Sequence, residues 1–259
     1  MFFLLMKKSF FDAWDNLGAL ILGNIGLFIV FALGLWPMFK ILENDTTAGF
    51  LILIVLIPAV FISLGIISTI MSQIVDYKRL SWGEIPDTFR KTWKASLLLS
   101  LISTVFFSMS IFGMIYYSSM KSLLGLAASA LLFWITVGVY FTLIWFFPVR
   151  NRLTGDFRKS LKKSALIMFD NLGLTIFLGF IMIPVNLILW PLTAFAAFGP
   201  AGIQLYLNSA LRLLILKYDW LEVNPDAKRK DVPWYELLVD EKERVGKRTL
   251  KGMIFPWKE

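Results

Sequence analysis

The side chains that most often carry out catalysis or bind metals are either missing from this chain or stand at the ends of its apolar segments. Histidine and cysteine are both absent, which excludes a disulfide, a thiolate nucleophile, an imidazole base and a Cys/His metal site. Asp15, Asp76, Asp170 and Asp219 stand at segment ends, and no Asp or Glu lies deep within one. No nucleophile elbow, phosphate-binding loop or His-Glu zinc motif occurs. We therefore expect no catalytic residue, no metal site, no cofactor and a protein that is not an enzyme.

Long apolar segments dominate the chain. Hydrophobic residues make up 58% of its 259 residues, and the mean hydropathy is +0.70, outside the range of soluble globular domains. A bilayer-spanning helix requires about 20 predominantly apolar residues. The sequence predicts an all-α, polytopic membrane helical bundle with six spans. They lie at about 17–41, 49–75, 95–117, 122–147, 171–194 and 200–217, the last being the least apolar.

The basic residues indicate how the spans are oriented. Leaving aside Arg212, 23 Lys and Arg residues lie on one side of the predicted spans, and only Lys40 and Lys121 lie on the other. The positive-inside rule then places both termini in the cytoplasm. The net charge of +8 is explained by topology and by anionic lipid headgroups rather than by nucleic acid. We expect two parts, a membrane domain over 1–217 and a cytoplasmic tail over 218–259.

Two stretches of the sequence are repeated. "WDNLGALILGNIGLFIVFALGLWP" and "FDNLGLTIFLGFIMIPVNLILWP" both follow Lys-Lys-Ser and both run outward, so the repeat is parallel. A second match joins "FRKTWKASLLL" to "FRKSLKKSALI". We interpret the pattern as three helical hairpins (spans 1–2, 3–4 and 5–6), each introduced by a short basic and aromatic amphipathic helix in the cytoplasmic interface. Asp15 and Asp170 are expected to cap the helix that follows each of them.

The residues most suited to contact a partner or the membrane interface lie at the inner ends of the spans and in the tail. Arg212 either reaches the interface along its own stem or pairs with a partner or an inner-loop carboxylate. In the tail, "PWYELLVDEKERV" predicts one helix starting at Pro233. The aromatic residues of the final "MIFPWKE" are expected to dock on the chain's own inner face, on the membrane interface or on a partner. The candidates are Asp15, Asn16, Arg90, Lys91, Trp93, Arg158, Lys159, Asp170, Asn171, Arg212, Phe255 and Trp257.

Three short motifs together resemble the YesL-like family of small bacterial integral membrane proteins. They are "DNL" followed by Asn in the first span, "FRKTWK" before the third span and "YLNSALR" in the last one. The resemblance covers about residues 9–217, whereas the long tail after Lys217 departs from the family's short ending. It implies about six spans, the bacterial inner membrane and genes for carbohydrate ABC importers nearby, and it supplies no catalytic residues. We expect a non-enzymatic accessory or scaffold subunit associated with a transporter, such as a carbohydrate ABC importer. The alternative is a small-solute transporter or channel in its own right.

Overall fold

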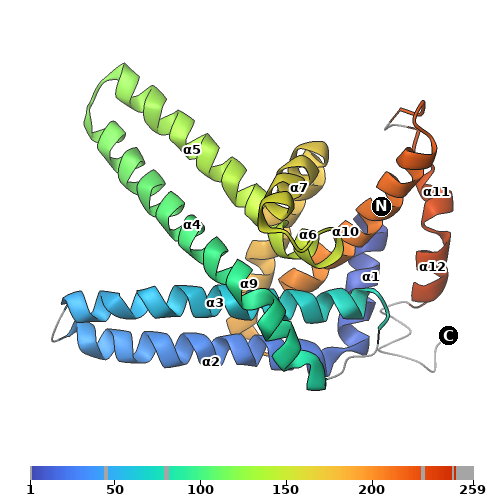
Figure 1. Cartoon of the computed structure of the whole chain (residues 1–259), viewed down its shortest axis with the longest axis horizontal. Helices are drawn as coiled ribbons and strands as arrows, with labels where there is room; N and C mark the ends of the chain where they lie inside the picture. The colour runs from blue at the N-terminus through green and yellow to red at the C-terminus, as the bar shows by residue number, and fades with distance from the viewer. Residues whose placement is uncertain (1, 44–45, 79–81, 229–230, 247, 249–259) are drawn as a thin grey trace.

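The chain is helical throughout the part that the structure describes. The computed structural model describes residues 2–43, 46–78, 82–228, 231–246 and 248, and within these ranges it contains helices and turns but no strand (Figure 1). The all-α class predicted from the sequence is therefore confirmed. The α-helices are α1 (Phe2–Asp15), α2 (Leu17–Leu42), α3 (Thr46–Val75), α4 (Ile85–Ser119), α5 (Leu123–Leu143), α6 (Phe146–Arg152), α7 (Phe157–Asp170), α8 (Leu172–Phe177), α9 (Ile183–Leu192), α10 (Pro200–Val223), α11 (Trp234–Leu237) and α12 (Val239–Val245), with a 3-10 turn η1 (Trp82–Glu84) and a π-helical segment η2 (Leu178–Met182).

Five helical stretches in the described residues are long and apolar enough to cross a membrane. They are Leu17–Leu42, Leu51–Val75, Ile85–Ser119, Leu123–Arg152 and Leu172–Leu192. These helices are compatible with the predicted multi-pass membrane protein. The sixth predicted span also forms a helix, α10, but it does not belong to this apolar set because Gln204, Asn208 and Arg212 interrupt it.

Two helical hairpins give the molecule its shape (Figure 1). α2 and α3 lie side by side, while α4 crosses α3 and then diverges from it together with α5, so that the two hairpins form a V. The crossing is tight at Gly65 of α3, where a Cβ would lie only 2.6 Å from side-chain atoms of Ser96 and Thr92 on α4. α10 packs mainly against α3 and α1, and its Leu205 and Leu211 are fully buried. α1 and α12 lie together at the end opposite the α2–α3 turn.

The repeated Asp-Asn-Leu-Gly phrase marks a break between two helices in both copies. α1 meets α2 at Asn16 (φ −125°, ψ 33°), and α7 meets α8 at Asn171 (φ −132°, ψ 49°). Each Asn Nδ2 donates to the backbone carbonyl four residues earlier, at 2.9 and 3.1 Å. The prediction that Asp15 and Asp170 cap the following helices is wrong, because the Asn occupies the N-cap position and makes no side-chain capping bond there. The phrase therefore encodes a change of chain direction.

The segment before the third predicted span is not a separate interfacial helix. α4 is one continuous helix of 35 residues, and "FRKTWK" lies on its early turns. At 1.5 Å per residue α4 is about 52 Å long, whereas the hydrocarbon core of a bilayer is about 30 Å thick. A separate helix is thus present at α1 and α7, which precede a break. The expectation of a separate helix is wrong for this segment, which lacks the Asp-Asn pair.

The start of α10 is held by a polar side chain from α2. Asn24 is fully buried, and its Nδ2 donates to the carbonyl oxygen of Ala196 at 2.8 Å. Its Oδ1 accepts from the backbone N–H of Ala201 at 2.8 Å. The first N–H groups of a helix have no partner within the helix, so Asn24 satisfies a group that would otherwise be costly to bury.

The two copies of Trp-Pro play different structural roles. Trp190 is buried near the end of α9, and its Nε1 donates to the carbonyl of Phe195 in the following turn at 3.0 Å. The ring lies against Gly199, which has φ 127° and ψ −155°. Trp36, by contrast, is 66% exposed, with Lys40 above its ring. Only the second copy therefore shapes a turn.

The fifth span is interrupted by the π-helical segment η2. The N–H of Ile183 bonds to the carbonyl of Leu178, five residues earlier, and the next residue, Pro184, has no N–H to donate. The carbonyl of Gly179 is thus left without its helical partner, and the hydroxyl of Tyr140 on α5 donates to it at 3.1 Å. Pro-interrupted helices persist in membranes when a neighbouring helix satisfies the freed backbone group in this way.

The tail forms two short helices rather than the single helix predicted from Pro233. α11 and α12 are separated at Leu238 (φ −103°, ψ 8°), which is buried against the bundle. The break turns α12 so that Glu241 and Val245 are also buried. Residues 231–246 therefore pack on the chain's own helices.

Candidate functional site

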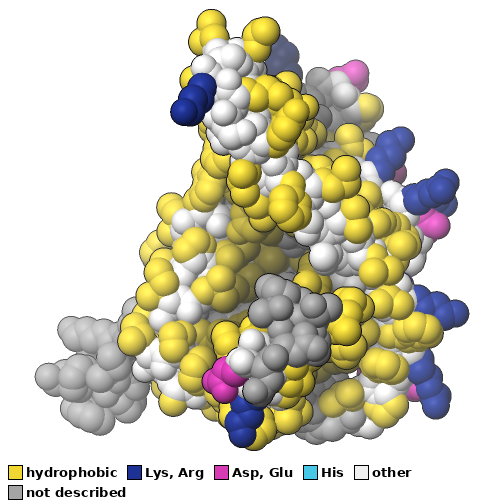
Figure 2. Space-filling model, turned by 90° about the vertical axis from the view of Figure 1, so that its left-hand side faces the viewer, with side chains coloured by type: hydrophobic (Ala, Val, Ile, Leu, Met, Phe, Trp, Pro, Cys, Tyr) yellow, Lys and Arg dark blue, Asp and Glu magenta, His cyan; other side chains and the backbone are white. Residues whose placement is uncertain are grey.

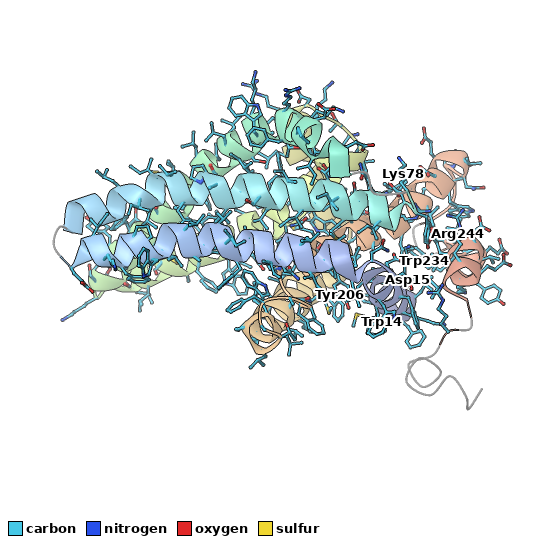
Figure 3. The ribbon with its side chains drawn as sticks, turned by 90° about the horizontal axis from the view of Figure 1, so that it is seen from below. Trp14, Asp15, Lys78, Tyr206, Trp234 and Arg244 are labelled. Atoms are coloured by element: carbon cyan, nitrogen blue, oxygen red, sulfur yellow. The ribbon has the colours of Figure 1, made fainter. Side chains whose placement is uncertain are left out.

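Six charged residues and one tyrosine, from five segments, meet where α12 packs on the other helices. The members are Lys8 and Asp12 of α1, Asp76 and Tyr77 after α3, Arg152 of α6, Arg212 of α10 and Glu241 of α12, which we call the α12 network. Figure 3 shows Lys78, Trp234 and Arg244 at the same end of the molecule, with Trp14, Asp15 and Tyr206 grouped around α1. Of the seven members, only Arg212 was a candidate from the sequence.

Glu241 is the centre of the α12 network. Its side chain is 4% exposed, and its Oε1 accepts from Arg212 Nε at 2.7 Å. Its Oε2 accepts from the hydroxyl of Tyr77 at 2.9 Å and lies 3.4 Å from Lys8 Nζ. A buried carboxylate is stable when it is both paired and hydrogen-bonded, and Glu241 has both kinds of partner.

Arg212 pairs with carboxylates, which is one of the two arrangements expected for it. Besides Glu241, it contacts Asp76, whose Oδ1 lies 2.6 Å from Arg212 Nη1 and 2.6 Å from Arg152 Nη1. Arg152 also donates to the carbonyl of Ser72 at 3.2 Å. The chain after α3 is thus connected to both α6 and α10.

Lys8 is completely buried although it belongs to the first helix of the chain. Its Nζ donates to Asp12 Oδ2 at 2.8 Å and to the Tyr77 hydroxyl at 2.7 Å. Tyr77 has φ 56°, a left-handed conformation that is uncommon for a residue with a large side chain. The N–H of Lys78 bonds to the carbonyl of Gln73 at 2.9 Å, as in a Schellman helix ending. This ending turns the Tyr77 ring toward Lys8.

Burial and ion pairing shift the pKa values of the carboxylates in the network in opposite directions. Burial favours the protonated form of Glu241, but Lys8 and Arg212 outweigh it and hold the pKa of Glu241 below its ordinary value. Burial raises the pKa of Asp12 despite the adjacent Lys8. Burial and the Glu241 carboxylate raise the pKa of Tyr77, so its hydroxyl remains protonated and donates to Glu241.

The docking of α12 is expected to weaken in acid but not near neutrality. A carboxylate with a lowered pKa contributes stability above its ordinary value, 4.5 for Glu241, and that contribution is lost as the pH falls through the lower folded value. A spin label on the exposed face of α12, at Glu243→Cys, should stay immobile from pH 7 to about pH 5 and become mobile below 4.5. The same label with Glu241→Gln should show little of this acid dependence. A rise in mobility between pH 7 and pH 5 would assign the control to another group.

A second polar cluster holds the break between α7 and α8. Asp170 Oδ2 accepts from Lys217 Nζ at 2.9 Å and from the Tyr218 hydroxyl at 2.8 Å. Asn171 completes the cluster, since its Oδ1 accepts from Lys217 at 2.9 Å and its Nδ2 donates to Tyr218 at 2.7 Å. The end of α10 therefore fixes the second Asp-Asn pair. The first Asp-Asn pair, Asp15 and Asn16, does not belong to this cluster. Asp15 Oδ2 instead lies 2.6 Å from Arg248 Nη1 at the surface.

The other interface candidates are exposed on α4 and α7. Arg90 is 3.6 Å from Asp87, both side chains being largely exposed, and the carbonyl of Lys91 accepts from Arg150 at 3.1 Å. Trp93 is half-buried, with Lys94 beside its ring. Arg158 and Lys159 are exposed on the first turn of α7. Phe255 and Trp257 lie outside the described residues.

The network is suited to holding segments together. Its carboxylates are each engaged by Lys or Arg, and the described residues contain no group of three or more Asp or Glu that could hold a metal ion. Two signals in the sequence point weakly to the α12 network, the i,i+4 spacing of Lys8 and Asp12 and the acidic residues of the tail.

Searches against protein-family models, curated protein sequences and solved structures gave no match to this chain.

Proposed function

We propose that the protein is a non-enzymatic accessory or scaffold subunit that associates with a transporter in the bacterial inner membrane. A carbohydrate ABC importer is the partner class that the sequence resemblance suggests. The observation that carries the proposal is the divergence of the α4–α5 hairpin from the α2–α3 hairpin (Figure 1). In Figure 2 the surface between the hairpins is recessed and covered with hydrophobic side chains.

The α4–α5 hairpin has the features of an arm that packs on another membrane protein. It is held as a unit, because a Cβ on Gly113 would meet Leu132 at 2.6 Å, and Ser129 donates to the carbonyl of Met114 at 3.3 Å. Its outer half is otherwise exposed, with Phe112 at 72% and Trp134 at 66%. Helices associate in membranes through such close packing, and a hairpin that leaves its own bundle offers this packing to a partner.

The proposed topology has six spans, three hairpins and both termini in the cytoplasm. α10 is about 36 Å long at 1.5 Å per residue, enough to cross the hydrocarbon core. Its polar residues Gln204 and Asn208 are buried among other helices, so it needs no apolar face toward lipid. The excess of basic residues at the α1–α12 end supports placing that end inside.

A transporter or channel acting alone is the second candidate. It is favoured by a buried polar group between α3, α6 and α10, in which Asn208 Nδ2 donates to the Ser68 hydroxyl at 3.1 Å and Asn151 Nδ2 donates to the same oxygen at 3.1 Å. The two amide nitrogens are satisfied within the cluster, whereas the buried Asn208 Oδ1 has no hydrogen-bond partner among the described residues. Polar side chains commonly connect helices in membranes in this way, so the cluster supports this candidate less than the hairpin supports the first.

Crosslinking from single cysteines should separate the two candidates. The chain has no native cysteine, so Phe112→Cys and Trp134→Cys each provide one thiol on the arm. We expect both to crosslink in native membranes to the same transporter subunit, which should also co-purify in mild detergent. Ile188→Cys on α9, similarly exposed at 64%, is the control and should not crosslink. A purified chain that transports solute alone after reconstitution, with no crosslinked partner, would overturn the proposal in favour of the second candidate.

A further inference from the structure

α1 buries three polar residues and leaves large apolar side chains exposed on its other face. Its polar residues Lys8, Ser9 and Asp12 face the bundle and are buried. Leu4, Leu5 and Phe11 are buried beside them, whereas Phe3 is 83% exposed and Trp14 is 51% exposed. Aromatic side chains at such positions suit the boundary between headgroups and acyl chains. The outward face of α1 therefore matches lipid better than water.

A cavity of about 430 Å³ opens beside this face of α1. Its walls come from α1, from Tyr206 of α10 and from Arg248 of the tail, so it joins the membrane-facing helices to the docked tail. The lining is mostly apolar and contains two basic residues. It includes Phe3, Met6, Phe10 and Tyr206, with Lys7 and Arg248 as its cations.

The two basic residues that line the cavity carry an excess positive charge. Lys7 Nζ donates to the carbonyl of Gly246 at 2.9 Å, and it has no carboxylate partner among the residues that the structure describes. Arg248 pairs with Asp15 at 2.6 Å, both side chains being about half exposed. One cation of the two is thus not neutralised by a side chain, and it stands next to an apolar cavity.

We propose that this cavity binds an anionic phospholipid, with its phosphate at Lys7 and Arg248 and an acyl chain along Phe3, Met6 and Phe10. A lipid bound there contacts α1, α10 and the tail at once, so it binds the docked tail better than the undocked one. Any ligand with such a preference shifts the equilibrium toward the state that it prefers. Anionic lipid is therefore a ligand that keeps the tail docked. The proposal does not depend on the transporter partner.

Native mass spectrometry of the full chain in mild detergent tests the binding. We expect phosphatidylglycerol to be retained and phosphatidylcholine not to be. Lys7→Gln with Arg248→Gln should weaken phosphatidylglycerol retention on the order of tenfold, because each basic group near a membrane contributes to anionic lipid binding. Lys94→Gln with Lys162→Gln, which removes two exposed basic groups on α4 and α7, should retain the lipid like the wild type. Equal loss in both double variants would mean nonspecific surface attraction and would overturn the site.

Two further measurements test the occupant and the link to the tail. Just below pH 4.5, where α12 begins to be released, the spin label at Glu243→Cys should be less mobile in nanodiscs containing phosphatidylglycerol than in nanodiscs of phosphatidylcholine. Lys7→Gln with Arg248→Gln should abolish this response. An unchanged response in that double variant would contradict the proposed link. Deleting residues 249–259 should leave phosphatidylglycerol retention unchanged. A clear increase after the deletion would show that the chain's own end fills the cavity, which would overturn the lipid assignment.

Discussion

Glu241→Gln is expected to release α12 from the bundle. The substitution removes the negative charge that faces Lys8, which is fully buried, and Arg212, whose Nε lies 2.7 Å from Glu241 Oε1. Removing one member of a buried ion pair leaves an uncompensated charge and costs about 3–5 kcal/mol. A short segment such as α12 has little other burial to offset that loss. The spin label at Glu243→Cys should therefore become mobile, and protease should cut the tail while the membrane helices remain protected.

Asp240→Asn provides a matched control for this prediction. Asp240 is the preceding residue of α12 and is exposed, so its substitution removes the same charge without touching the network. We expect the tail of this variant to stay docked. Equal release in both variants would mean that the overall charge of α12, rather than the buried contacts of Glu241, controls docking.

Gly199→Ala is expected to destabilise the start of α10 and, with it, the whole bundle. Gly199 has φ 127° and ψ −155°, a region that essentially only glycine adopts and that costs another residue about 1–3 kcal/mol. A Cβ there would also lie 2.5 Å from the ring of Trp190, which is fixed by its hydrogen bond to Phe195. We expect a total loss of about 3 kcal/mol or more, measured as a lower midpoint of thermal unfolding in detergent.

Gly26→Ala tests whether this loss is specific to the turn. Gly26 lies inside α2, and no atom beyond its chain neighbours and the adjacent backbone of α2 lies within 4 Å of the position of its Cβ. Alanine is favoured over glycine in a helix by about 1 kcal/mol, so this variant should be as stable as the wild type or slightly more stable. A comparable fall in both variants would contradict the role assigned to Gly199.

Features set by local composition could be predicted from the sequence. The apolar segments gave the class, and the predicted first span, 17–41, agrees with α2 (Leu17–Leu42) within one residue. The sequence correctly locates the Asp-Asn phrase as a repeat, but the expected role of its aspartate as a helix cap is wrong. An aspartate before a helix commonly caps it, and sequence alone does not reveal that Asn16 and Asn171 bond backward to the preceding turn.

Features set by distant contacts could not be predicted in the same way. Lys8 belongs to a basic pair at the start of the chain, which indicates only how the helices are oriented. Its partner Glu241 lies 233 residues later. The continuity of α4 and the break at Leu238 also depend on what packs against them. Arg212 is intermediate, since the rarity of charges in spans identified it but left its partner undecided between Asp76, Glu241 and the interface.

The position of Glu241 late in the chain also determines the order in which the molecule can be completed. At about 5–20 residues per second, Glu241 is synthesised roughly 10–50 s after Lys8. During that interval Lys8 lacks its partner Glu241, although Asp12, four residues after Lys8, is already present. Arg212 follows much later and precedes Glu241 by only 29 residues. The α12 network is therefore completed only when translation reaches α12, which makes the docking of α12 a late step in the assembly of the fold.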